Sequence, residues 1–226
     1  MCFSAEVSFG SAAVLISAGA WCLRSATRRA LWIWPFALVP CLFGVQQASE
    51  GLVWVGLHRQ AAGLVQVSAG VYLFFALAFW PTWFSVAATL IESHPVRRRF
   101  LAVWAASSTG WFFVIFLPLV GEFGPPTVRE VHHSIRYEYA DTGGRWQEPL
   151  ELWVQRLLYI LTAGVPLVTT SARKLLLIPL GSSLLSAVVA ACLFDHAFTS
   201  VWCLWSAVAS AGLVYAVAIA PEKPPN

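Results

Sequence analysis

The sequence predicts an all-α membrane protein with seven transmembrane helices, and two observations support that prediction. Of the 226 residues, 58% are hydrophobic and only 11% are charged, and the mean hydropathy is +0.70. An average soluble domain has about a quarter charged residues, so lipid must cover part of this apolar surface. Seven apolar stretches, each long enough to cross about 30 Å of hydrocarbon as a helix, nearly fill the chain. We therefore expect a single transmembrane domain over residues 1–220 and a short tail at residues 221–226.

The division into seven helices depends on how the last apolar region is split. One helix from Leu175 to Ile219 would have about twice the length that a bilayer requires. Only Asp195 and His196 interrupt this region, so a tight turn is expected there. The predicted helices are Val7–Leu23, Leu31–Leu57, Leu64–Ile91, Phe100–Val120, Leu150–Thr170, Leu175–Phe194 and Ala197–Ile219.

The basic residues predict how the helices are oriented. Of the 14 lysines and arginines, 9 lie on alternate connections, which therefore belong to one side of the membrane. These are Arg24, Arg28, Arg29, Arg97, Arg98, Arg99, Arg173, Lys174 and Lys223. Short basic loops stay in the cytoplasm, so the N-terminus is expected outside and the C-terminus inside. No basic run precedes the first apolar stretch, which is typical of an uncleaved first helix rather than a signal peptide.

The longest connection, residues 121–149, is predicted to be external and to contain a small β-hairpin. Residues 134–139 alternate polar and apolar side chains with a period of two, as in a half-buried strand. The segment Asp141–Gly144 is typical of a turn, and Arg145 and Trp146 would begin the second strand. We expect this hairpin to lie over the external mouth of the helix bundle.

Glu50 is the main candidate for a functional side chain, because ionisable groups inside a membrane are energetically costly. Gln46 and Gln47 stand four and three residues before it, so the three side chains share one helix face, and Trp54 follows four residues later. One interpretation is an interhelical hydrogen-bond cluster that contains a protonated Glu50. The other is a carboxylate that binds a ligand, a metal ion or a proton.

The last predicted helix carries a polar stripe that can line a cavity opposite Glu50. His196, Thr199 and Cys203 are spaced three and four residues apart, from the outer end inward. Together with Gln46, Gln47, Glu50 and Trp54, Thr199 and Cys203 form the expected ligand-binding set.

The predicted topology also gathers metal-ligand residue types toward the outer end. These candidates for zinc or copper are Cys2, Glu50, His58, His132, His133, Asp195 and His196. Their spacing matches no metal motif, since an HExxH sequence is absent and His132 and His133 are adjacent. Cys2 has three interpretations: an N-terminal cysteine after removal of Met1, a buried thiol, or a disulfide partner of Cys192.

Two motifs resemble a family of uncharacterised bacterial multi-pass membrane proteins. They are the opening Met1-Cys2-Phe3-Ser4-Ala5 and the segment from Gln46 to Trp54, and the pair Trp202-Cys203 is similar too. The resemblance implies a bacterial membrane protein and singles out Cys2, Gln46, Gln47, Glu50 and Trp54. It implies no activity.

Three functions remain open from the sequence. The first is a membrane protein whose outward-facing polar cavity binds or translocates a small ligand or ion through Glu50. The second is an intramembrane zinc-type hydrolase with a metal-activated water, and the third is a structural subunit of a membrane complex. The expected location is the bacterial cytoplasmic (inner) membrane, with the bilayer as partner. Nucleic acid is not expected as a partner, because no basic stripe with interleaved aromatic residues occurs.

Overall fold

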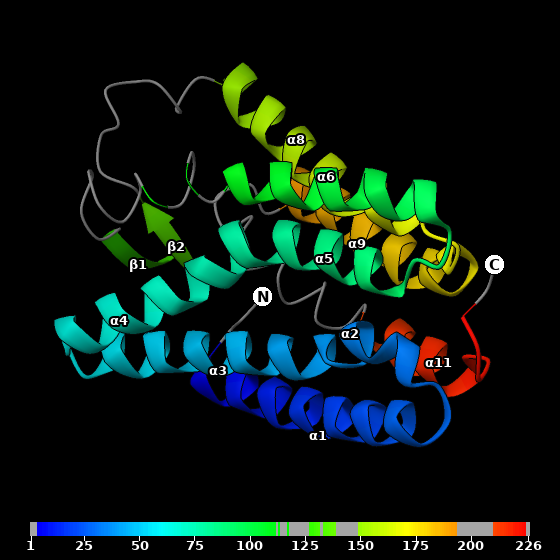
Figure 1. Cartoon of the computed structure of the whole chain (residues 1–226). Helices are drawn as coiled ribbons and strands as arrows, with labels where there is room; N and C mark the ends of the chain where they lie inside the picture. Colours follow the sequence, from blue (N-terminus) through cyan, green and yellow to red (C-terminus); the bar gives the residue numbers. More distant parts are fainter. Residues whose placement is uncertain are drawn as a thin grey trace.

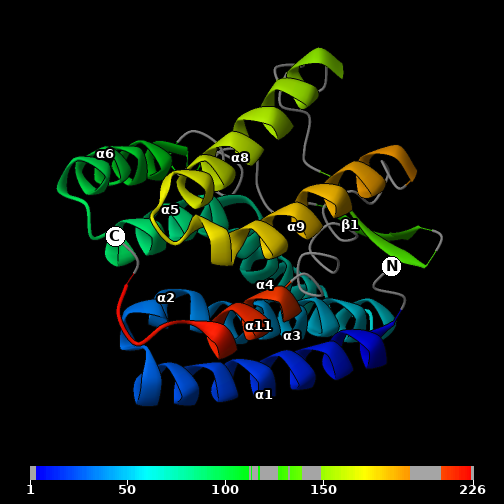
Figure 2. The ribbon, with the colours of Figure 1, turned by 90° about the vertical axis from the view of Figure 1, so that its right-hand side faces the viewer.

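The computed structural model describes residues 4–111, 113, 117, 127–131, 133–138, 149–193 and 210–224, and these residues are mostly helical. The helices are α1 (Ala5–Arg29), η1 (Leu31–Ile33), α2 (Trp34–Ala37), α3 (Val39–His58), α4 (Ala62–Leu73), η2 (Phe74–Phe79), α5 (Trp80–Ile91), α6 (Pro95–Trp111), α8 (Pro149–Thr169), α9 (Arg173–Leu193) and α11 (Ala211–Ile219). The strands β1 (Thr127–Val131) and β2 (Ser134–Glu138) form one two-stranded sheet. In Figures 1 and 2, α1, α3 and α11 lie in one layer, and α5, α6, α8 and α9 lie in the other.

Within the part of the chain that the structure describes, three helical segments are long and apolar enough to cross a membrane. They are α1, the run Leu31–His58 and the run Ala62–Ile91, and each coincides with a predicted span. Large apolar side chains are exposed on their surfaces, such as Val14 on α1 and Val67 on α4, both 69% exposed. Apolar helices with an apolar exposed surface are expected where lipid replaces water. This confirms the membrane class and the first three helices, while the total of seven and the orientation stay predictions.

Of the later helices, α8 and α9 follow the predicted stretches closely, whereas α6 begins five residues before its predicted stretch. α6 begins at Pro95, α8 covers Pro149–Thr169 and α9 covers Arg173–Leu193. α11 forms the end of the stretch Ala197–Ile219. The turn expected at residues 195–196 lies outside the described residues.

Helices α1 and α3 pack closely because small residues line their contact. A Cβ atom added to Gly19 would collide with Cys41, and one added to Gly44 would meet Ile16. Phe9 at the start of α1 contacts Gly51 near the end of α3, so the two helices run antiparallel. Glycine lets helix backbones approach each other, which is the usual means of helix association in a membrane.

A π-helical turn, η2, joins α4 to α5, and Pro81 explains it. The N–H of Trp80 bonds to the carbonyl of Phe75, five residues back, rather than to that of Ala76. In the same π register Ala76 would accept from residue 81, but proline has no N–H. The hydroxyl of Tyr159 on α8 donates to the Ala76 carbonyl instead, at 2.7 Å. A bond from another helix thus satisfies the carbonyl that the proline leaves open.

The β-hairpin forms, with a strand pairing that the sequence did not predict. β2 begins at Ser134 as expected, yet it pairs antiparallel with the preceding strand β1, from Val131 opposite Ser134 to Thr127 opposite Glu138. Val131 pairs directly with Ser134, so only two residues separate the strands in the sequence. The turn predicted at Asp141–Gly144 and the strand expected from Arg145 lie outside the described residues. His133 has φ 56°, a left-handed conformation that histidine tolerates better than most residues. A two-residue loop brings the strands together at a lower entropic cost than a longer one.

Candidate functional site

The polar residues of α3 form a fully buried face. Gln46, Gln47 and Glu50 each have no exposed surface, and Ser49 is buried beside them. The spacing of three and four residues places Gln46, Gln47 and Glu50 on one side of the helix, as the sequence predicted. We call Gln46, Gln47, Glu50 and Trp54 the α3 polar face. It lies inside a segment that is long and apolar enough to span a membrane.

Gln46 is held in place by Trp80, the first residue of α5. The indole N–H of Trp80 donates to Oε1 of Gln46 at 2.7 Å, and the Trp80 ring stacks on Phe43 with 3.9 Å between ring centroids. Because the indole N–H donates to an oxygen, this bond fixes the orientation of the Gln46 amide. Oε1 faces Trp80, and Nε2 points away from it. Among the described residues the buried Nε2 of Gln46 has no hydrogen-bond partner.

Trp54 stands one turn beyond Glu50 and is 1% exposed. Its ring packs with Val53, with Ala69 of α4 and with Ile135 of the hairpin, and it lies 5.9 Å from the ring of His58. The hairpin therefore covers the end of α3 next to Glu50. The indole N–H of Trp54 is buried, and the described part of the chain offers it no acceptor.

Ser8 of α1 adds a third polar atom at the level of Glu50, since Phe9 contacts Gly51. Its hydroxyl is fully buried, again without a partner among the residues that the structure describes. An unsatisfied buried polar group costs about 1–3 kcal/mol, and native proteins contain few of them. Three such groups in the same region of the bundle are typical of a site that accepts a polar ligand or water.

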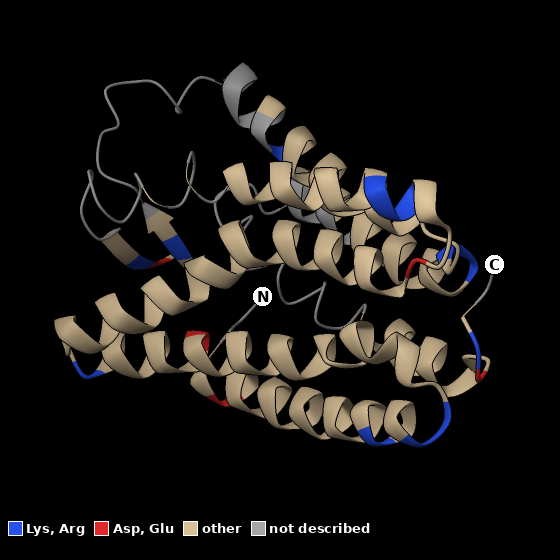
Figure 3. Ribbon diagram, in the orientation of Figure 1, with Lys and Arg blue, Asp and Glu red and all other residues tan. Residues whose placement is uncertain are grey.

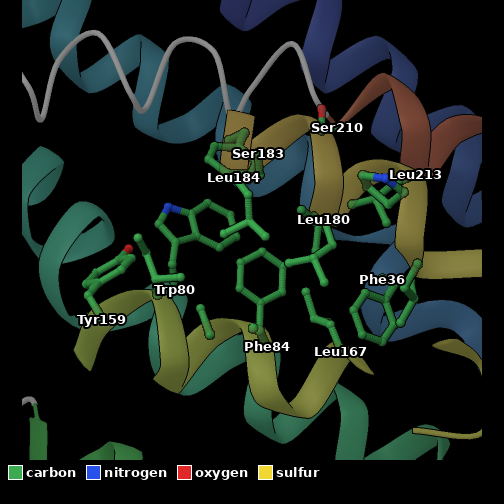
Figure 4. A pocket seen from close by; sticks show the side chains of 17 residues that line it. Phe36, Trp80, Phe84, Tyr159, Leu167, Leu180, Ser183, Leu184, Ser210 and Leu213 are labelled. Carbon is green, nitrogen blue, oxygen red and sulfur yellow. The ribbon is translucent and has the colours of Figure 1, made fainter. Parts of the chain in front are cut away.

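An apolar cavity of about 80 Å³ lies on the other side of Trp80. Figure 4 shows side chains from several helices pointing into it, among them Phe36, Phe84, Tyr159 and Leu184. Trp80 also lines this cavity while its N–H bonds to Gln46. Its indole ring therefore forms the wall between the apolar cavity and the α3 polar face.

The structure brings together only part of the predicted site. Gln46, Gln47, Glu50 and Trp54 share the α3 polar face, whereas Thr199 and Cys203 lie outside the described residues. Cys2, His132, Asp195 and His196 also lie outside them, and so does any bond between Cys2 and Cys192. Cys192 itself is exposed.

The remaining metal candidates do not assemble into a metal site. The described residues contain no group of three His, Cys, Asp or Glu side chains that could hold a metal ion. His58 lies 4.0 Å and His133 3.7 Å from the carboxylate of Glu130 on β1. Both histidine side chains are mostly exposed, at 60% and 80%, so these contacts add little stability. The two histidines lie at the hairpin and at the end of α3, and Glu50 is about two helical turns from His58 along α3.

Sequence reasoning missed Glu92, a buried carboxylate at the opposite end of the molecule. Ser171, between α8 and α9, donates to Glu92 from its hydroxyl at 2.6 Å and from its backbone N–H at 2.7 Å. The backbone N–H of His94 donates as well, and Nε of Arg97 lies 3.4 Å away. Burial alone raises the pKa of Glu92, but the bonds from Ser171 and His94 and the charge of Arg97 outweigh it and hold that pKa below its ordinary value. An acidic residue just before three arginines was the signal in the sequence.

The fold and the site define a class of protein: a helical membrane protein with a buried polar face on one of its apolar helices. Comparisons with protein-family models, curated proteins and solved structures find no match to this chain.

Proposed function

We propose that this chain is a seven-span protein of the bacterial cytoplasmic membrane that binds or translocates a small polar ligand or an ion through Glu50. The observation that carries the proposal is the complete burial of Gln46, Gln47 and Glu50 on one face of an apolar helix. Polar side chains inside a membrane are costly, and they usually mark ligand sites or ion paths.

The seven-span part of the proposal rests on helix lengths and on charge. α8 and α9 have 21 residues each, or about 31 Å at 1.5 Å per residue, which matches the thickness of the hydrocarbon core. Most of the arginines and lysines lie at one end of the molecule (Figure 3). By the positive-inside rule this is the cytoplasmic end, which makes the hairpin end external.

The chemistry of the α3 polar face indicates what kind of ligand fits. The buried Nε2 of Gln46 and the indole N–H of Trp54 are donors, and in the described part of the chain no acceptor meets them. They lie one turn to either side of Glu50. A ligand with acceptor atoms for these donors and a proton or positive charge for the carboxylate would complement all three.

Two measurements on purified protein test the proposal, with Glu50→Gln as the variant. Native mass spectrometry from lipid nanodiscs should detect a bound small molecule in the wild type that Glu50→Gln loses. Proteoliposomes containing a pH-sensitive dye should show proton flux that the same variant abolishes. Glu6→Gln is the matched control, because Glu6 is an exposed carboxyl on α1. If Glu50→Gln folds and matches the wild type in both assays, Glu50 is a structural hydrogen-bonding group.

The hydrolase and structural-subunit hypotheses are separated by elemental analysis. Stoichiometric zinc or copper that both Glu50→Ala and His196→Ala lose would favour the metal-dependent hydrolase. A metal-free protein without a bound ligand or flux would leave the structural role.

A further inference from the structure

Exposed basic residues gather at one end of the molecule, where α1 ends and where α6 and α9 begin, and Figure 3 marks their positions along the ribbon. They are Arg24, Arg28, Arg29, Arg98, Arg99, Arg173, Lys174 and Lys223. Of the described acidic residues near them, Glu92 is buried and only Glu222 is exposed. This end therefore carries a large positive charge.

The Glu92 contacts bring the beginnings of α6 and α9 together. Nη2 of Arg97 donates to the hydroxyl of Ser171 at 2.7 Å, and that hydroxyl donates to Glu92. Arg97 is followed by Arg98 and Arg99, and Ser171 is followed closely by Arg173 and Lys174. We call Arg98, Arg99, Arg173 and Lys174 the α6–α9 basic surface.

These four cations lack a counter-charge among the described residues. No acidic side chain there forms an ion pair with any of them, and the oxygens of Glu92 are occupied by Ser171, His94 and Arg97. Arg98, Arg173 and Lys174 also lie in the first turn of their helices, where the helix dipole is itself positive, and Arg99 follows directly after it. Basic residues are unfavourable in this position, and a bound anion would relieve the repulsion.

Apolar side chains lie directly beside this charge. Val96 and Phe100 of α6 are 67% and 44% exposed, and Leu177 and Ile178 of α9 are 52% and 60% exposed. A free phosphate ion has no use for apolar surface. A phospholipid provides both a phosphate for the cations and acyl chains for the neighbouring side chains.

We infer that the α6–α9 basic surface binds the phosphate of an anionic phospholipid headgroup in the leaflet at this end of the bundle. Basic pockets between membrane helices on the cytoplasmic side are suited to such headgroups. The inference rests on the membrane-spanning arrangement of the proposed function but not on Glu50, so Glu50→Gln leaves this lipid binding unchanged.

The test is a lipid titration of the full chain in neutral detergent, followed by native mass spectrometry. Phosphatidylglycerol and phosphatidylcholine serve as probes, because they differ in headgroup charge. The wild type should prefer phosphatidylglycerol. The variant R98Q/R99Q/R173Q/K174Q should bind phosphatidylglycerol at least about tenfold more weakly than the wild type does. The matched control R24Q/R28Q/R29Q/K223Q removes four charges from the same end and should keep the preference.

Three outcomes would overturn the inference. One is equal binding of the two lipids by the wild type, and another is an equal loss of phosphatidylglycerol binding in both variants. The third is displacement of phosphatidylglycerol by millimolar inorganic phosphate, which would show a site for a free ion. Tryptophan fluorescence unfolding of both variants checks that each is folded. If the first variant is unfolded, the single substitutions Arg98→Gln and Lys174→Gln should each weaken phosphatidylglycerol binding, and unchanged binding in both would equally refute it.

Discussion

The close packing of α1 against α3 predicts that Gly19→Ala destabilises the protein although alanine is the better helix former. A Cβ atom on Gly19 would lie 2.5 Å from Sγ of Cys41, 3.0 Å from its Cα, and closest to its backbone nitrogen. An ordinary van der Waals contact begins at 3.4 Å. The helices would therefore have to separate by almost 1 Å, because a backbone atom cannot rotate away as a side chain can.

The expected size of the effect follows from two opposing contributions. Overpacking of a well-packed contact costs about 1–3 kcal/mol, whereas replacing glycine by alanine inside a helix gains about 0.5–1 kcal/mol. We expect a net loss of about 1–2 kcal/mol for Gly19→Ala. Gly10→Ala is the control on the same helix, because a Cβ there meets nothing within 4 Å. It should be neutral or stabilising by up to about 1 kcal/mol.

Equilibrium unfolding in mixed detergent micelles, followed by far-UV circular dichroism, measures both variants. The difference between them isolates the contact with α3, because the gain in helix propensity is common to both. If Gly19→Ala is as stable as Gly10→Ala, the two helices do not pack as closely as described and the reasoning fails.

Three further predictions concern other contacts. Because the folded-state pKa of Glu92 is lowered, its stabilisation should be complete above the pKa of an unfolded glutamate, about 4.3, and should be lost as the pH falls through the folded-state value. Glu92→Gln should therefore unfold more easily than the wild type at pH 7 and approach it in acid; a constant difference between pH 7 and pH 3 would contradict this. Tyr159→Phe should cost about 1–3 kcal/mol in thermal unfolding by leaving the Ala76 carbonyl without its donor, whereas Tyr215→Phe, at an exposed position, should cost nothing measurable. His133→Gly should slow hydrogen exchange of the strand amides of the hairpin, because glycine adopts the positive φ of residue 133 without the penalty of about 1 kcal/mol; faster exchange would refute it.

The helices were predictable because their signal is local. Apolar stretches of sufficient length predicted α8 and α9 to within two residues, whereas α1 continues six residues beyond its predicted end at Leu23. The burial of the α3 polar face was also predictable, since the spacing of Gln46, Gln47 and Glu50 alone places them on one side of the helix. A face so polar is costly against lipid, so it had to point into the protein.

The hairpin shows where local signals fail. The alternation from Ser134 onward identified β2 correctly, but two segments flank it and either can pair with it. The turn signal at Asp141–Gly144 predicted pairing with the following segment, which lies outside the described residues, and the pairing with β1 was missed. Ile135 packs in one cluster with Val53 and Trp54, which explains why one side of β2 is apolar. An apolar side does not identify the strand that pairs with β2.

The sequence by itself determined the membrane class, the approximate positions of the described helices and the polar face that includes Glu50. These properties depend on residue type and on the helical period, which act over a few neighbouring residues. Only the tertiary structure decided that Trp80 fixes Gln46, that Tyr159 satisfies Ala76 and that Glu92 joins Ser171 to Arg97. Each of these bonds joins residues of different helices or connections. Many polar residues of the chain could supply such a partner, and the packing of the helices selects the one that lies within reach.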